Sequence, residues 1–324
     1  MIIYLVGDFM KYSTEMIAFK SSNKVNIVRG KIIAPAPGEE IKGVVQISHG
    51  MCEYFDRYDE FVEFLVSKGY VVAGHDHIGH GDSVNDENER GFFAKENGYK
   101  FLVKDLYYMT QIIKKRYPYI PYFLLGHSMG SFISRCYIAE YGKEIDGVIL
   151  MGTMGPQWAV DAGIQLAERL IQKKGEMYRS KKLDQLCFEF ANINFEPAST
   201  KYDWTCRDKN AIDRHIQDEK MKFIFTVSAF KDLFQLVKYS NDEKNIKNTP
   251  KRLPMFIISG DMDPVGEDGV GVKKVYDLYK KIGIKDVTFK LYQDCRHELL
   301  NEINKSEIYK DIEDWIELIR FGEE

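Results

Sequence analysis

The chain has 324 residues, of which 44% are hydrophobic and 29% are charged, and its formal net charge is -4. This composition is that of an ordinary globular protein with one large domain or two small ones, and it excludes disordered, collagen-like and coiled-coil proteins. No dense run of Lys or Arg could follow a phosphate backbone, so we expect no nucleic-acid partner.

No stretch reaches the roughly 20 apolar residues that cross a bilayer, so no transmembrane segment is expected. The apolar opening MIIYLVGDF has no basic residue before it and no small-residue cleavage site after it, which makes it a poor signal peptide. Met10 is as good a start as Met1. The five cysteines (52, 136, 187, 206 and 295) form no close-spaced pair, as is typical of reduced thiols. These features predict a cytoplasmic protein.

In chain order, the segment before residue 43, including Val25 to Ile33, indicates antiparallel strands. Short β-rich runs then alternate with helical periods. The runs lie at 44–47, 70–73, 122–125 and 148–151, and the helical periods at 58–65, 102–113 and about 129–141. Runs that are apolar on both faces and separated by helices are typical of buried parallel strands with helices on both sides of the sheet.

This alternation stops near residue 153, and about a hundred residues follow that read as aromatic-rich helices. Strand patterns return at 255–258 and 287–291, followed by a final helix that carries Ile308 and Trp315. We therefore predict an α/β core formed by residues 1–152 and 253–324, with residues 153–252 as a helical cap inserted between two strands.

The strongest local signal is Gly126-His127-Ser128-Met129-Gly130, which follows a predicted strand and opens a predicted helix. This G-x-S-x-G turn is typical of a nucleophile elbow, in which a tight strand-to-helix bend lifts the serine hydroxyl above the sheet. Backbone N–H groups of the following helix can face developing negative charge. Ser128 is therefore the predicted nucleophile.

A serine hydroxyl needs a base, and the base needs a carboxylate to orient it. Only His215 and His297 follow Ser128, and His297 is favoured because it lies in a loop after a predicted strand, whereas His215 lies within the insertion. The loop after the preceding strand holds Asp261 and Asp263. We favour Asp263 as the carboxylate, because it has room to point back over the strand ends, and expect Asp261 to cap the turn.

Two backbone amides are candidates for an oxyanion hole. One belongs to Met129, directly after the nucleophile. The other belongs to Met51, in the loop Ser48-His49-Gly50-Met51 that follows the first predicted parallel strand.

Taken together, these residues resemble the α/β-hydrolase superfamily, and within it the monoacylglycerol lipase and lysophospholipase group. The resemblance is carried by the segments 49–58, 75–83, 126–130, 260–263 and 296–298, and it covers most of residues 43–152 and 253–320. It implies an esterase triad of Ser128, Asp263 and His297, oxyanion amides at Met51 and Met129, no cofactor, and a helical cap over an acyl-binding groove.

The chain departs from this group in several places. Cys52 stands where members often have Gly, and Tyr54 stands where they often have His. The insertion is longer than in the better-known monoacylglycerol lipases. Its stretch Trp204-Thr205-Cys206-Arg207-Asp208 looks similar to uncharacterised bacterial lysophospholipase-like hydrolases.

Other side chains have simpler interpretations. His75, His77 and His80 lack the further ligands and spacing of a metallohydrolase, so no metal site is predicted. Glu53 and Arg57, at i and i+4, indicate a structural ion pair or a loop anchor. Cys52 and Cys295 are most simply buried thiols.

The sequence thus predicts a serine hydrolase that cleaves a small acyl ester, most simply a single-acyl glycerolipid or lysophospholipid. Alternatives in the same class are a short-chain or aryl esterase and a peptidase for small substrates. A non-catalytic binding protein of the same fold is the alternative from another class. The apolar cap also allows transient contact with a membrane surface.

Overall fold

The computed structural model describes residues 12–189 and 191–322, so the predictions about Met1, Met10 and the apolar opening lie outside the described residues. Its strands are β1 (Tyr12–Lys20), β2 (Ile27–Pro35), β3 (Gly43–Ser48), β4 (Tyr70–His75), β5 (Tyr122–His127), β6 (Gly147–Met151), β7 (Met255–Gly260) and β8 (Val287–Tyr292). The α-helices are α1 (Asp59–Ser67), α2 (Gly98–Arg116), α3 (Met129–Tyr141), α4 (Val160–Lys174), α5 (Lys181–Phe188), α6 (Lys209–Gln217), α7 (Val227–Asn241), α8 (Glu243–Ile246), α9 (Val270–Lys281) and α10 (Lys305–Phe321). Short 3-10 turns lie at Phe55–Tyr58, Glu87–Glu89, Gly142–Glu144, Ile193–Phe195, Glu219–Met221 and Leu299–Asn301.

The eight strands form one sheet in the order β1-β2-β4-β3-β5-β6-β7-β8. Strands β4 to β8 and β3 run parallel, whereas β1 pairs antiparallel with β2 and β2 antiparallel with β4. The predicted mostly parallel sheet and the antiparallel strands before residue 43 are confirmed. Because the parallel strands share a direction, the loops that follow β3, β5, β6, β7 and β8 meet at one edge.

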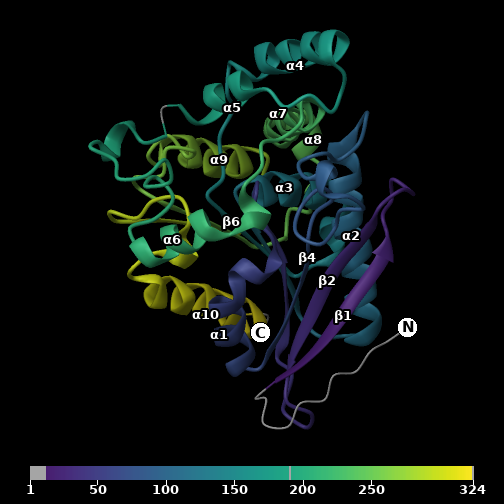
Figure 1. Cartoon of the computed structure of the whole chain (residues 1–324). Coiled ribbons are helices and arrows are strands. Elements are labelled where there is room, and N and C mark those ends of the chain that lie inside the picture. The colour runs from purple at the N-terminus through teal and green to yellow at the C-terminus, as the bar shows by residue number, and fades with distance from the viewer. Residues whose placement is uncertain (1–11, 190, 323–324) are drawn as a thin grey trace.

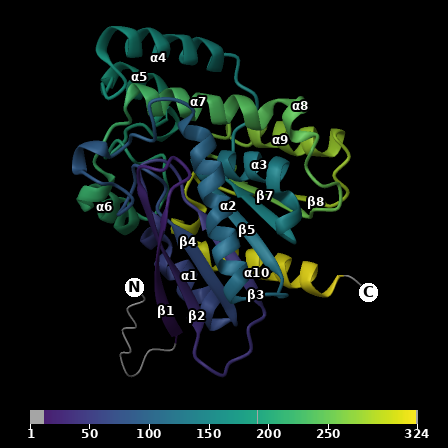
Figure 2. The ribbon, with the colours of Figure 1, turned by 90° about the vertical axis from the view of Figure 1, so that its right-hand side faces the viewer.

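Helices cover both faces of the sheet (Figures 1 and 2). Neighbouring residues of β3 point to opposite faces, as the period of two in a strand requires. Val44 belongs to the core beneath α2, α3 and α9, and Val45 to the core beneath α1 and α10. The central strands are therefore buried on both sides, which explains their continuous apolar sequences.

The helices α4 to α8 all lie between β6 and β7 in the chain, and we call residues 152–254 the helical insertion. In it, α7 packs against α3, and α4 packs on α7 farther from the sheet (Figure 1). The described part of the insertion adds no strand to the sheet; its one bridge joins Arg179 and Thr226. None of the helices in residues 12–189 and 191–322 is both long and apolar enough to cross a membrane.

Candidate active site

Ser128 lies in a sharp turn between β5 and α3. Its backbone angles, φ 51° and ψ -120°, are ones that side-chain-bearing residues rarely adopt, so the turn is strained. The flanking glycines permit it: a Cβ on Gly130 would lie 1.9 Å from the Ser48 carbonyl oxygen, and one on Gly126 would lie 2.5 Å from the Gly130 oxygen. The geometry is that of the elbow that the sequence predicts.

The loop after β3 lies against this elbow. A Cβ on Gly50 would be 3.1 Å from Ser128 Cβ, which brings the adjacent Met51 close to the serine. His49 holds the loop: its Nε2 accepts from the His77 N–H at 2.9 Å, so its Nδ1 carries the proton and donates to the Gly50 carbonyl at 2.8 Å. Met51 and Met129, which opens α3, are thus both near Ser128.

The loops after β7 and β8 bring Asp263 and His297 together. His297 Nδ1 lies 2.9 Å from Asp263 Oδ1, and the fully buried carboxylate also accepts from Ser259 Oγ and the Val265 N–H, both at 2.9 Å. Burial by itself would raise the pKa of Asp263, but the charge and hydrogen bond of His297 and the two other donors lower it below its usual value. Asp263 is therefore ionised at neutral pH.

His297 sits beside the elbow. The ring centroid of His127, the residue before the serine, is 4.9 Å from that of His297. A Cβ on Gly152, which follows β6, would be 3.0 Å from His297 Cε1. The contacts of the described residues include no hydrogen bond from the Ser128 hydroxyl to His297; such bonds often form only when substrate binds.

The alternative residues lie elsewhere. Asp261 Oδ1 is buried without a hydrogen-bond partner in the described part of the chain, so the expected turn cap is not formed by this oxygen. His215 lies in α6 and is buried rather than exposed, with its ring 4.1 Å from that of Tyr202. Of the two histidines after Ser128, His297 is the one bonded to a carboxylate of the β7 loop.

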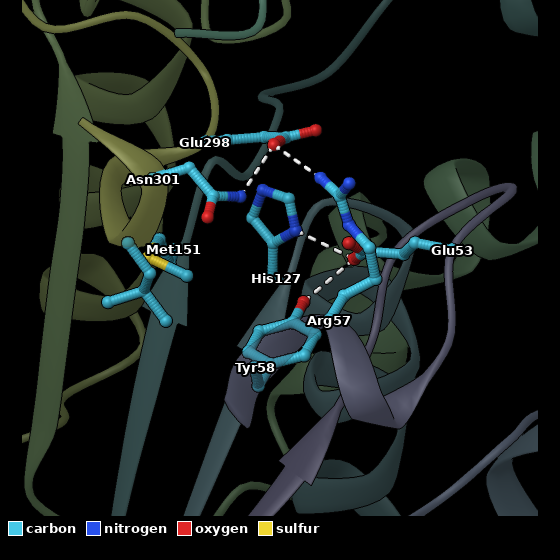
Figure 3. Close-up of a pocket in the computed structure, with 8 residues that line it drawn as sticks. Glu53, Arg57, Tyr58, His127, Met151, Glu298 and Asn301 are labelled. Carbon is cyan, nitrogen blue, oxygen red and sulfur yellow. Dashed lines mark hydrogen bonds and ion pairs between the residues drawn. The ribbon is translucent and has the colours of Figure 1, made fainter. Parts of the chain in front are cut away.

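Behind the elbow lies a buried charged cluster that the sequence did not predict (Figure 3). Glu53 accepts from the Gly50 N–H, from Tyr58 Oη at 2.7 Å and from His127 Nδ1 at 2.9 Å. Arg57 donates instead to Glu298, at 3.0 Å. The expected Glu53–Arg57 ion pair is therefore wrong, whereas Glu53 does anchor the loop.

The electrostatics of this cluster favour charged forms. Burial by itself would raise the pKa of Glu53, but the nearby His127 lowers it to about 2. Burial would lower the pKa of His127, but Glu53 outweighs it and raises that pKa. A cavity of about 10 Å³ among these residues has room for roughly one water molecule. The only sequence signal for this cluster was the proximity of Glu53 to the oxyanion loop.

The other histidines and the thiols are buried and uncharged. His49, His75, His77 and His80 pack ring against ring, and burial lowers the pKa of each, that of His75 to about 3. The described residues contain no group of three or more His, Cys, Asp or Glu side chains that could hold a metal. Burial raises the pKa of the Cys52 thiol, and raises that of Cys295 to about 11.

Cys52 also explains one departure from the resembled group. Its φ of 56° lies in the left-handed region, where glycine is the favoured residue. Its Sγ donates to the Phe223 carbonyl of the helical insertion at 3.4 Å. The substitution thus adds a contact between the oxyanion loop and the insertion.

Known proteins share this architecture. Over 278 residues the chain is 30% identical to a monoglyceride lipase homologue of monkeypox virus, covering 85% of this chain and 89% of the relative. It is 27% identical over 284 residues to the monoglyceride lipase of Rattus norvegicus, covering 86% and 84%. The structure of a thermostable carboxyl esterase from Bacillus coagulans matches with a TM-score of 0.89 and 28% identity, over 95% of this chain and 99% of that one.

The family model for serine aminopeptidase S33 matches residues 39–304, which include β3 to β8 and every candidate site residue. Its match, the lipase relatives and the strand order agree on one fold. The chain is an α/β-hydrolase and belongs to the serine aminopeptidase S33 family.

Proposed function

We propose that Ser128, His297 and Asp263 form the catalytic triad of a serine hydrolase, with the Met51 and Met129 amides as its oxyanion hole. The observation that carries this proposal is the hydrogen bond between His297 Nδ1 and the ionised, buried Asp263, located beside the strained Ser128 turn. That bond leaves Nε2 as the ring nitrogen able to take a proton from the serine.

In the proposed reaction, Ser128 Oγ attacks an acyl carbonyl carbon while His297 Nε2 removes its proton. The oxyanion is held by the two backbone amides, and Asp263 stabilises the imidazolium. His297 then protonates the leaving alcohol, which departs as the acyl-enzyme forms. Water, deprotonated by His297, releases the acid and restores Ser128.

The chain is a carboxylic ester hydrolase, as its lipase relatives and its carboxyl esterase structural neighbour indicate. For the substrate we propose a single-acyl lipid, a monoacylglycerol or a lysophospholipid. Aromatic side chains of the insertion support an apolar substrate: Trp204 contacts His297 and stacks with Phe188, and Phe223 lies beside Cys52. We also propose that residues 153–252 act as a cap over the acyl chain.

A fluorophosphonate probe tests the nucleophile. The wild-type chain should be labelled, and Ser128→Ala should not. Ser134→Ala is the matched control, because it removes a buried hydroxyl of α3 whose oxygen has no hydrogen-bond partner among the described residues. Absence of wild-type labelling would favour the non-catalytic alternative, and labelling of Ser128→Ala would refute the assigned serine.

A matched pair of variants tests the carboxylate. Asp263→Asn should lower kcat by about 10⁴-fold, since the amide can no longer hold the productive imidazole tautomer. Asp261→Asn should change kcat by less than about threefold, because its Oδ1 has no partner to lose. The reverse result would exchange the two roles.

Substrate class is tested with p-nitrophenyl esters of two to sixteen carbons, monoacylglycerol, lysophosphatidylcholine and an aminoacyl p-nitroanilide, with Ser128→Ala as the blank. Preference for long chains, with release of glycerol or glycerophosphocholine, would support the lipid proposal. Activity confined to short esters, or to the anilide, would replace it by the esterase or peptidase alternative.

A further inference from the structure

One segment of the helical insertion, residues 203–207, lies directly on the loop that carries His297, and we call it the docking segment. Arg296 donates through Nη1 to the carbonyl oxygens of Asp203 and Cys206. On the other side of the histidine, the Glu298 N–H donates to the Thr205 carbonyl at 2.6 Å. Both chain neighbours of His297 are therefore hydrogen-bonded to the insertion.

A buried carboxylate joins the two segments. Glu302 is fully buried and accepts from the Arg296 N–H at 2.7 Å and from Arg207 Nε at 2.7 Å. Arg207 also donates through Nη2 to Asn304 Oδ1 at 2.7 Å. This planar fork satisfies acceptors at two positions after the histidine loop, which a lysine could not do in the same geometry.

The docking segment also covers the histidine itself. The Trp204 ring centroid is 5.1 Å from that of His297, and the indole stacks on Phe188 of α5 at 5.9 Å. Within the insertion, Asn192 Oδ1 accepts from the Trp204 N–H at 2.8 Å. His297 is thus only 3% exposed, although it stands in a loop.

We propose that Trp204 is a positioning residue for His297, and that Arg207 holds the docking segment in the place where Trp204 can act. The inference rests on the proposed role of His297 as the base. An imidazole that accepts the serine proton and then donates it to the leaving group needs one ring position to within a fraction of an ångström. Here that position depends on a segment of the insertion, in addition to Asp263.

The test measures how fast Ser128 reacts with a small dialkyl phosphorofluoridate, whose short alkyl groups make little use of an acyl groove. The rate then reports activation of the serine rather than binding of a long chain. Trp204→Ala should lower the second-order labelling rate at least tenfold, and Trp204→Phe, which keeps a ring there, should stay within about threefold of wild type.

Arg207→Lys tests the anchor from a distance, because Arg207 does not touch His297. It should lower kcat several-fold with KM nearly unchanged. Arg214→Gln is the matched control: it breaks another contact between insertion and core, the exposed Arg214–Glu60 pair at 3.6 Å, which does not involve the histidine loop. Its labelling rate and kcat should equal those of the wild type.

Circular dichroism confirms folding before each rate is measured, and Trp204→Leu replaces Trp204→Ala if the latter does not fold. Wild-type labelling rates in folded Trp204→Ala or Trp204→Leu would overturn the inference and leave the proposed function intact. Failure of the wild-type chain to react would instead refute the proposed function. Equal losses in Arg207→Lys and Arg214→Gln would also overturn the inference, since any weakened insertion contact would then suffice.

Discussion

A methyl group at Gly152 would press on the catalytic imidazole. Gly152 has φ +60°, and a Cβ there would lie 3.0 Å from His297 Cε1 and 3.1 Å from Nδ1. Carbon atoms in contact normally lie about 3.5–4.0 Å apart, so the ring must move by roughly 0.5 Å. Because a shift of about 1 Å can cost about 100-fold in rate, Gly152→Ala should lower kcat/KM about tenfold.

The same substitution also has a cost to stability that must be separated from the effect on the ring. Alanine in a left-handed conformation costs about 1–2 kcal/mol. Gly283→Ala is the matched control, since Gly283 has φ +87° and a Cβ there would meet no atom within 4 Å. Both variants should lose similar free energy of unfolding, and only Gly152→Ala should lose activity.

The assay is hydrolysis of p-nitrophenyl butyrate beside urea unfolding of the two variants. Equal activity in both variants would refute the reasoning, because it would mean that the His297 ring tolerates the methyl group. Equal loss in both would also refute it, because the strain alone would then account for the effect.

Three further predictions follow from the buried groups. The carboxylate of Glu53 has its pKa lowered to about 2, so it contributes stability that is complete above its ordinary pKa of about 4.5 and is lost as the pH falls through 2, about 3 kcal/mol in all; urea unfolding at pH 5, 4, 3 and 2 should show a shallower acid loss in Glu53→Gln, and an unchanged slope would contradict this. Fully buried Arg135 donates to the Met154 carbonyl at 2.9 Å and to the Ser240 carbonyl at 2.6 Å, near the two ends of the helical insertion, so Arg135→Met should lower the free energy of unfolding by about 3 kcal/mol, whereas Arg169→Met, at an exposed site on α4, should change it by less than about 0.5 kcal/mol; equal effects would contradict the argument. Burial raises the pKa of the Cys52 thiol, so iodoacetamide at pH 7.5 should neither modify it nor reduce activity within an hour, and mass spectrometry showing rapid alkylation at this residue would refute the prediction.

The sequence determined the local features that short-range chemistry specifies. Apolar runs separated by helical periods predicted the sheet and its helices, and α3 begins and ends at Met129 and Tyr141 as expected. The glycines around Ser128 predicted a turn that only residues without side chains permit at those two places. Chain order narrowed the base to His297 or His215.

The pairing of distant side chains was decided only by the tertiary structure. Asp261 and Asp263 are equivalent in the sequence, and the course of the β7 loop decides which of them meets His297. The i, i+4 spacing of Glu53 and Arg57 suggested an ion pair, but burial places better partners nearby, His127 for one and Glu298 for the other. Local spacing predicts a contact only where no stronger partner arrives from elsewhere in the chain, and in a buried site the carboxylate with the shortest path to a cation takes it.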